Sequence, residues 1–152
     1  MIAHINIGSN LGHRAELIAR AVSMLDPAVG RIMAVSRPVE SEPDGFESPN
    51  TFINVGVNVE TALGAEEIVG RLRQIELAID ARGSHRNERG EYCDRKIDLD
   101  LICLDAIVSN SPTATLPHPR MAARRFVLEP MAEILPDWIH PTLKKTPGEL
   151  LG

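Results

Sequence analysis

The chain has 152 residues, 43% of them hydrophobic, so we expect a single domain with its own core over residues 1–152. Its 16 basic and 21 acidic residues give a net charge of −5, which argues against nucleic-acid or anionic-membrane partners. No apolar run approaches the roughly 20 residues of a membrane span. Cys93 and Cys103 lack metal-ligand spacing, which fits a cytoplasmic protein with reduced thiols.

Hydrophobic periodicity predicts a series of helices and strands up to residue 103. In chain order they are a strand at 2–7, a helix at 11–25, strands at 31–37 and 53–59, a helix at 64–80 and a strand at 97–103. We expect Asp26-Pro27 to end the first helix, and only shorter pieces after residue 103. The order β-α-β-β-α-β is typical of the ferredoxin-like arrangement, an α+β fold in which helices cover an antiparallel sheet.

Two polar, glycine-bearing segments lie between these elements. SEPDGFESPN occupies residues 41–50, and GSHRNERGEYCD occupies residues 83–94. Loops of this length in a small domain often carry function. We expect both to be open without ligand and to close over bound substrates, which would exclude water from a reactive phosphate.

The segment IDLDL at residues 97–101 places two carboxylates in an apolar strand. Because strand side chains alternate, Asp98 and Asp100 share one face, roughly 7 Å apart. Three interpretations remain open: a sheet face exposed to solvent, an ion pair with Arg95 or Lys96, and a divalent-metal site. Hard carboxylate oxygens suit Mg²⁺, and two of them on a rigid strand can hold two ions for phosphoryl transfer.

Arginines flank this pair, although the protein as a whole is acidic. Ten of the sixteen basic residues fall between Arg71 and Arg125, and nine of the ten are arginine. They include Arg82, Arg86, Arg89 and Arg95 upstream, and Arg120, Arg124 and Arg125 downstream, next to His118. Carboxylates for Mg²⁺ with arginines for phosphate oxygens are what a polyphosphate substrate requires.

These motifs together resemble the 6-hydroxymethyl-7,8-dihydropterin pyrophosphokinase family of folate biosynthesis. The similar segments are INIGSNLG (5–12), FINVGV (52–57), RQIE (73–76), DRKIDLDLI (94–102) and LPHPRMAARRFVLEPMAEILP (116–136). The resemblance implies transfer of pyrophosphate from ATP to the hydroxymethyl group of the pterin, with release of AMP. It also implies two Mg²⁺ ions and a monomeric enzyme with small-molecule substrates.

The resemblance implies roles by position. Asp98 and Asp100 would hold the metal ions, with Arg82, Arg86 and Arg95 as further catalytic residues. The pterin would be bound by Ser41, Pro43, Asp44, Gly45, Phe52, Asn54, Tyr92 and Phe126. The nucleotide side would include Arg73, Glu76, Arg89, Leu101 and His118, and Arg124 would bind phosphate or hold the closed state.

The chain departs from the family pattern mainly on the nucleotide side. Arg73 stands where the family has glutamine, and Thr113 where it often has arginine. These changes leave open which of Arg82, Arg86 and Arg89 contacts phosphate.

Two other functions remain open. Gly83-Ser84 ahead of the Asp-Leu-Asp motif resembles polymerase-beta-type nucleotidyltransferases, which attack the α-phosphate and release pyrophosphate. The other is a non-catalytic pterin- or nucleotide-binding relative. The intact carboxylate pair argues against it, because a neutral pterin does not need two carboxylates on a core strand.

Overall fold

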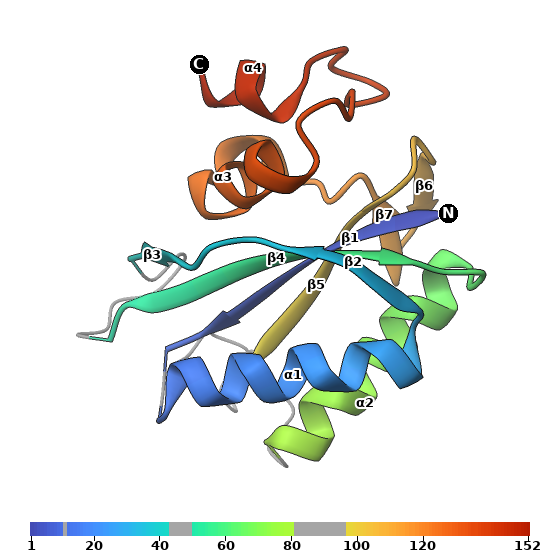
Figure 1. The fold of residues 1–152 in the computed structure, drawn as a ribbon. Coiled ribbons are helices and arrows are strands. Elements are labelled where there is room, and N and C mark those ends of the chain that lie inside the picture. Colours follow the sequence, from blue (N-terminus) through green and yellow to red (C-terminus); the bar gives the residue numbers. More distant parts are fainter. Residues whose placement is uncertain (11, 43–49, 81–96) are drawn as a thin grey trace.

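The computed structural model describes residues 1–10, 12–42, 50–80 and 97–152. Two helices, α1 and α2, lie between the strands in the first part of the chain, and α3 and α4 follow near its end (Figure 1). The elements are β1 (Ile2–Ser9), α1 (Arg14–Ala28), β2 (Arg31–Val35), β3 (Val39–Ser41), β4 (Phe52–Glu60), α2 (Ala65–Ile79), β5 (Asp98–Leu104), β6 (Ser109–Ser111), β7 (Ala114–Leu116), a 3-10 turn η1 (Met121–Ala123), α3 (Arg125–Ile134) and α4 (Pro147–Leu151).

The longer strands form one antiparallel sheet in the order β2-β4-β1-β5, and β3 pairs with β4 beside β2. β1 is central, so its residues have a neighbour on each side. Asn6 pairs with Gly56 on β4 and with Asp100 on β5, and Gly8 pairs with Asn54 and Asp98. The register therefore places β1 between β4, which carries Asn54, and β5, which carries Asp98 and Asp100.

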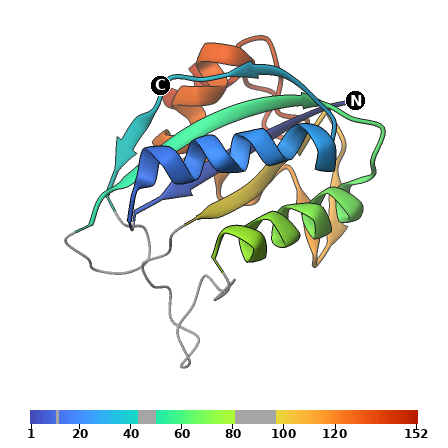
Figure 2. The ribbon, with the colours of Figure 1, turned by 60° about the horizontal axis from the view of Figure 1, so that its bottom comes forward.

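Helices cover both faces of this sheet. Figures 1 and 2 show α1 and α2 side by side across one face, while α3 lies on the opposite face with α4 packed against it. The expected α+β class, with helices on an antiparallel sheet, is confirmed. Among the described residues, no helix has the length and apolar character needed to span a membrane.

The main core lies between the sheet and α1 and α2. Alternate residues of β1 and β4, such as Ile5, Ile7 and Val57, point into it and are fully buried, as are Leu25 of α1 and Leu72 of α2. Truncating a buried leucine to alanine typically costs about 2–5 kcal/mol. This face therefore supplies much of the stability that holds the strands in register.

The opposite face of the sheet is polar and still buried. His4, Asn6, Asn54 and Asn58 all point to this side and are at most 6% exposed. Each must find hydrogen bonds, because burying an unpaired polar group is costly. His4 Nδ1 lies 2.8 Å from Asn58 Oδ1, and Asn58 Nδ2 donates to the carbonyl oxygen of Ile134 at 2.8 Å.

α1 has the length that the sequence predicts, but it begins and ends three residues later, at Arg14 and Ala28. It continues through Pro27 to Ala28, so the expectation that Asp26-Pro27 ends the helix is wrong. Pro27 lies in the last turn, where its missing N–H removes a single bond of the helix. The N–H of Val29 still donates to Leu25 O at 2.8 Å and closes that turn.

The elements that follow β5 are shorter than α1 and α2, as the sequence predicts, and α3 is the longest of them. Pro130 lies inside this helix, and a proline normally signals a helix end. Val127, Leu128 and Met131 are nevertheless buried at helical spacing, in a second core with Ile102 of β5. Burial against the sheet thus outweighs the local cost of the proline.

Candidate active site

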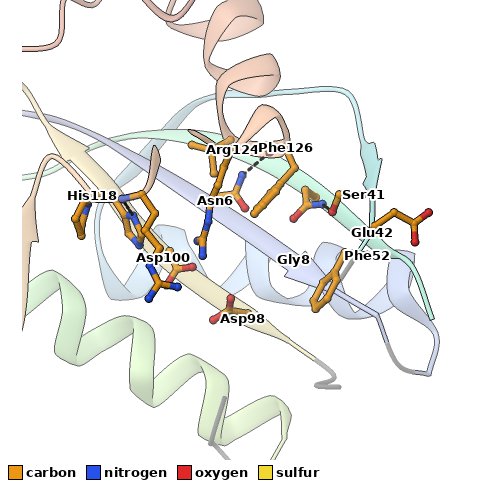
Figure 3. A pocket seen from close by; sticks show the side chains of 14 residues that line it. Asn6, Gly8, Ser41, Glu42, Phe52, Asp98, Asp100, His118, Arg124 and Phe126 are labelled. Atoms are coloured by element: carbon orange, nitrogen blue, oxygen red, sulfur yellow. Dashed lines mark hydrogen bonds between the residues drawn. The ribbon is translucent and has the colours of Figure 1, made fainter. Parts of the chain in front are cut away.

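A pocket of about 250 Å³ opens on the polar face of the sheet. Figure 3 shows its side chains converging from strands on the floor and from the start of α3 at the rim. Its walls include Asn6 and Gly8 of β1, Ser41 of β3, Phe52 and Asn54 of β4, Asp98 and Asp100 of β5, and His118, Arg124 and Phe126. The pocket therefore joins carboxylates, amides and aromatic rings with two arginines, Arg120 and Arg124.

The two aspartates occupy one wall of this pocket. Asp98 and Asp100 are half-buried and point to the same side of β5, as strand alternation requires. The face that they share is not an open sheet face, because the chain around α3 encloses it. Arg95 and Lys96, the expected ion-pair partners, lie outside the described residues.

Two side chains of helix α2, Arg73 and Glu76, hydrogen-bond the backbone of β5 between the two aspartates, and we call this pair the brace. Glu76 Oε2 accepts the backbone N–H of Leu99 at 2.7 Å, and Arg73 donates to the carbonyl oxygen of the same residue. Arg73 also donates to Glu76 Oε1 at 2.6 Å, and its Nη2 lies 3.9 Å from Asp100 Oδ1. Because β5 is at the edge of the sheet, these side chains replace the strand that would otherwise pair there.

Burial changes the acidity of Glu76. Loss of solvent raises the pKa of this carboxyl to about 8; Arg73 opposes the shift and the nearby charge of Asp98 adds to it. The side chain is 2% exposed. Glu76 thus lies behind the aspartates as a buried support and not on the pocket surface.

An amide and two aromatic rings form the opposite part of the pocket. Asn54 Nδ2 donates to Ser41 Oγ at 2.8 Å and to Val39 O at 3.3 Å, which fixes the orientation of the amide. Its Oδ1 lies over Gly8, where a Cβ would approach it to 2.9 Å. Phe52 and Phe126 also line this part. The group presents flat apolar surface with a fixed acceptor, as a polar heteroaromatic ring requires.

His118 lies between this pocket and a second cavity. Its Nδ1 accepts the backbone N–H of Arg120 at 3.1 Å, so the neutral ring carries its proton on Nε2. Burial and the positive charges of Arg124 and Arg120 lower the pKa of His118 to about 4, against an opposing effect of Asp98. At neutral pH this histidine is therefore a hydrogen-bond donor without a net charge.

The second cavity has a volume of about 360 Å³. Arg73, Leu101, Thr113 and His118 line it together with Asp100. It shares Asp100 and His118 with the first pocket, so one ligand could extend from one cavity to the other.

The structure brings many of the candidate residues to these two cavities. Ser41, Phe52, Asn54, Asp98, Asp100, His118, Arg124 and Phe126 line the first, and Arg73 and Leu101 line the second. The candidates Pro43, Asp44, Gly45, Arg82, Arg86, Arg89, Tyr92 and Arg95 lie outside the described residues.

Sequence reasoning missed Asn6 and Gly8 as pocket residues. The period-two pattern of β1 could have indicated them, because it places both residues on the face opposite the apolar Ile5 and Ile7. Only the register with β5 shows that this face meets the aspartates.

Comparison with known sequences gives a consistent result. A family model for 7,8-dihydro-6-hydroxymethylpterin-pyrophosphokinase (HPPK) matches residues 4–136. A 2-amino-4-hydroxy-6-hydroxymethyldihydropteridine pyrophosphokinase from Porphyromonas gingivalis strain W83 is 38% identical over 141 residues, which are 92% of this chain and 94% of the relative. One of the same name from Bacillus subtilis is 34% identical over 134 residues, covering 88% and 77% of the two chains.

Solved structures support the fold. An HPPK-DHPS chain in complex with substrates superimposes with a TM-score of 0.72 at 13% identity, and the wild-type HPPK-DHPS of Plasmodium falciparum with 0.70 at 14%. Both matches cover 98% of this chain but only 42% and 44% of those longer chains. The sequence matches define the chain as a pyrophosphokinase-type transferase. The chain belongs to the 7,8-dihydro-6-hydroxymethylpterin-pyrophosphokinase family.

Proposed function

We propose that the chain transfers pyrophosphate from ATP to the hydroxymethyl group of 6-hydroxymethyl-7,8-dihydropterin and releases AMP, as a step of folate biosynthesis. The observation that carries this proposal is the shared pocket: Asp98 and Asp100 lie in the same cavity as Asn54 and Phe126. Neither a nucleotidyltransferase nor a simple binding module is favoured by the family match.

The pterin ring binds in the part of the pocket formed by Asn54 and the two phenylalanines. Asn54 is held by Ser41, so its carbonyl oxygen faces the ring edge without the entropy cost of ordering on binding. Phe126 offers a π face, and the guanidinium carbon of Arg124 lies 5.4 Å from the centroid of the same ring. The ring is thereby placed with one end toward β5.

The triphosphate of ATP extends along the aspartate wall into the second cavity. Asp98 and Asp100 would hold Mg²⁺, and their oxygens suit this ion. Mg²⁺ commonly takes one or two carboxylates and completes its coordination with phosphate oxygens and water. We propose two ions, which would neutralise phosphate charge and draw the hydroxyl and the phosphates together.

The protein itself contributes position and charge. The hydroxymethyl oxygen attacks the β-phosphorus, the bond from that phosphorus to the α-phosphate oxygen breaks, and AMP leaves with the electron pair. His118 Nε2–H and Arg124 point donors at the phosphate oxygens from the pocket rim. The brace of Glu76 and Arg73 keeps Asp100 in place during transfer.

Several finer properties belong to the same proposal. The sheet order β2-β4-β1-β5, with helices α1 and α2 between strands, fits the ferredoxin-like arrangement. We propose that residues 1–152 act as one domain and as a cytoplasmic monomer. The expected closure of the loops 41–50 and 83–94 rests on residues 43–49 and 83–94, which lie outside the described residues.

Product analysis tests the function directly. The protein is mixed with ATP, Mg²⁺ and 6-hydroxymethyl-7,8-dihydropterin, and nucleotides are resolved by chromatography. AMP should form in step with pterin diphosphate, only with Mg²⁺, and Asp98→Asn or Asp100→Asn should reduce the rate by at least about 100-fold. Pyrophosphate release without AMP, or unchanged turnover in both variants, would contradict the proposal.

A further inference from the structure

Two buried asparagines tie the two ends of α3 to the sheet in the same way. Asn6 Nδ2 donates to the carbonyl oxygen of Phe126 at 3.1 Å, near the start of the helix. Asn58 Nδ2 donates to the carbonyl oxygen of Ile134 at 2.8 Å, at its end. Because only the NH₂ group can donate to a carbonyl, these contacts fix which way each amide points.

The two asparagines differ in what their oxygen atoms do. Asn58 Oδ1 accepts from His4 Nδ1 at 2.8 Å, so this amide is satisfied within the protein. No hydrogen bond to Asn6 Oδ1 is found within the described part of the chain, and the residue lines the pocket although it is only 6% exposed. An acceptor at a pocket wall that receives no hydrogen bond from these residues is available to a ligand.

Asn6 also occupies the place where the two halves of the site meet. Across the strand pair β1–β5 it lies directly opposite Asp100, and through Phe126 it touches the ring-binding part. Side chains opposite each other on one face have Cβ atoms about 4.5–5.5 Å apart. Figure 3 shows Asn6 between Asp100 and Phe126. A group that links a ring beside Phe126 to phosphates beside Asp100 must pass Asn6.

We propose that Asn6 positions the substrate hydroxyl: its Oδ1 accepts the hydrogen bond of the hydroxymethyl O–H and so turns an oxygen lone pair toward the β-phosphorus. The amide does not take the proton. The new bond joins the hydroxymethyl oxygen to the β-phosphorus, AMP leaves with the electron pair of the broken bond, and the hydroxyl proton passes to solvent. This role rests on the function proposed above and adds to it the orientation of the nucleophile, which strongly affects rate.

The test compares two ligands that differ by this hydroxyl alone. Dissociation constants of 6-hydroxymethylpterin and 6-methylpterin are measured by calorimetry with α,β-methylene-ATP and Mg²⁺ present, so that no transfer occurs. The wild-type protein should prefer the hydroxymethyl compound by about 3- to 10-fold, the range of one net hydrogen bond. Equal affinities in the wild type would overturn the proposal without any variant.

The variants Asn6→Ala and Asn58→Ala form a matched pair, because each loses one tie to α3. Asn6→Ala should abolish the preference for the hydroxyl and lower kcat/KM by about 10- to 100-fold. Asn58→Ala, with a similar thermal shift, should keep the preference. An Asn6→Ala protein that still discriminates the two ligands contradicts the role of Asn6 while leaving the function intact. Absence of AMP formation by the wild type would instead contradict the function.

Discussion

Glu76 Oε2 accepts the backbone N–H of Leu99 at 2.7 Å, and this one contact connects the buried face of helix α2 to the residue between the two pocket aspartates. Leu99 itself is fully buried, so its side chain and its backbone are both held from the same side of the sheet. The spacing of the two carboxylates therefore depends on a side chain that does not reach the pocket.

Removing this brace should weaken both stability and metal use. Glu76→Ala leaves the N–H of Leu99 and the guanidinium of Arg73 short of a partner, at a cost of about 1–3 kcal/mol in the free energy of unfolding. The Mg²⁺ concentration for half-maximal AMP formation should rise. Chemical denaturation and a Mg²⁺ titration measure the two effects. Glu67→Ala is the control. Glu67 forms an exposed i,i+4 ion pair with Arg71, and loss of this pair should cost at most about 0.5 kcal/mol in the free energy of unfolding.

The elevated pKa of Glu76 predicts a pH effect on stability. Folding raises the pKa of this carboxyl from 4.5 to about 8, so between these values the folded state holds a proton that the unfolded state has released. The contribution of Glu76 to the free energy of unfolding is complete below pH 4.5 and decreases as pH rises toward 8. Glu76→Gln, which cannot ionise, should remove this decrease. Parallel slopes for the two proteins in urea titrations from pH 5 to 8 would argue against it.

His4 should change the stability at acid pH, where, unlike Glu76, it makes the free energy of unfolding decrease as pH falls. Its burial lowers the pKa from 6.5 to about 4, although the hydrogen bond with Asn58 counters part of the shift. Between these values the unfolded state binds the extra proton, so the free energy of unfolding decreases as pH falls from 6.5 to 4.

The His4 effect can be isolated by substitution. His4→Gln should flatten this part of the pH profile, while His13→Gln, at an exposed position, should leave it as in the wild type. A wild-type profile that matches His4→Gln would show that another group causes the acid sensitivity.

Gly8 should control the fit of the ring. In Gly8→Ala the new Cβ would lie 2.9 Å from Asn54 Oδ1, so the amide must move. We expect the KM for the pterin to rise by about 10-fold, with a smaller change in the KM for ATP. Gly70→Ala, at an open helical position, is the control and should stabilise the protein by about 0.5–1 kcal/mol. Steady-state kinetics measures both KM values. Equal changes in the two would indicate a general structural effect and contradict a specific role of Gly8 at the ring.

The sequence predicts the α+β class and the aspartate pair well, because both depend on local periodicity. Ile5 and Ile7 against Asn6, and Leu99 against Asp98 and Asp100, are assigned to faces by strand alternation alone. Local patterns cannot show what covers a face. The polar residues of β1 and β4 look solvent-exposed in sequence, whereas α3 buries them.

The brace also escapes prediction. Arg73 and Glu76 read as an ordinary i,i+3 pair on a helix, and nothing local indicates that their partner is a strand edge more than twenty residues away. The role of Asn6 depends in the same way on the pairing of β1 with β5. Register between distant strands is set by the whole sheet, so these contacts appear only in three dimensions.

The docking of α3 has a consequence for assembly of the protein during synthesis. The strands that carry Asn6, Asn54 and Asp98 are all made before Phe126. Until α3 arrives, the sheet can form its register but has one face of polar and apolar side chains without cover, and the ring-binding wall is incomplete. The same ten-residue helix completes the second core and the cavity. A nascent chain should therefore acquire ligand affinity and resistance to protease in a single event, when its last third packs onto the sheet.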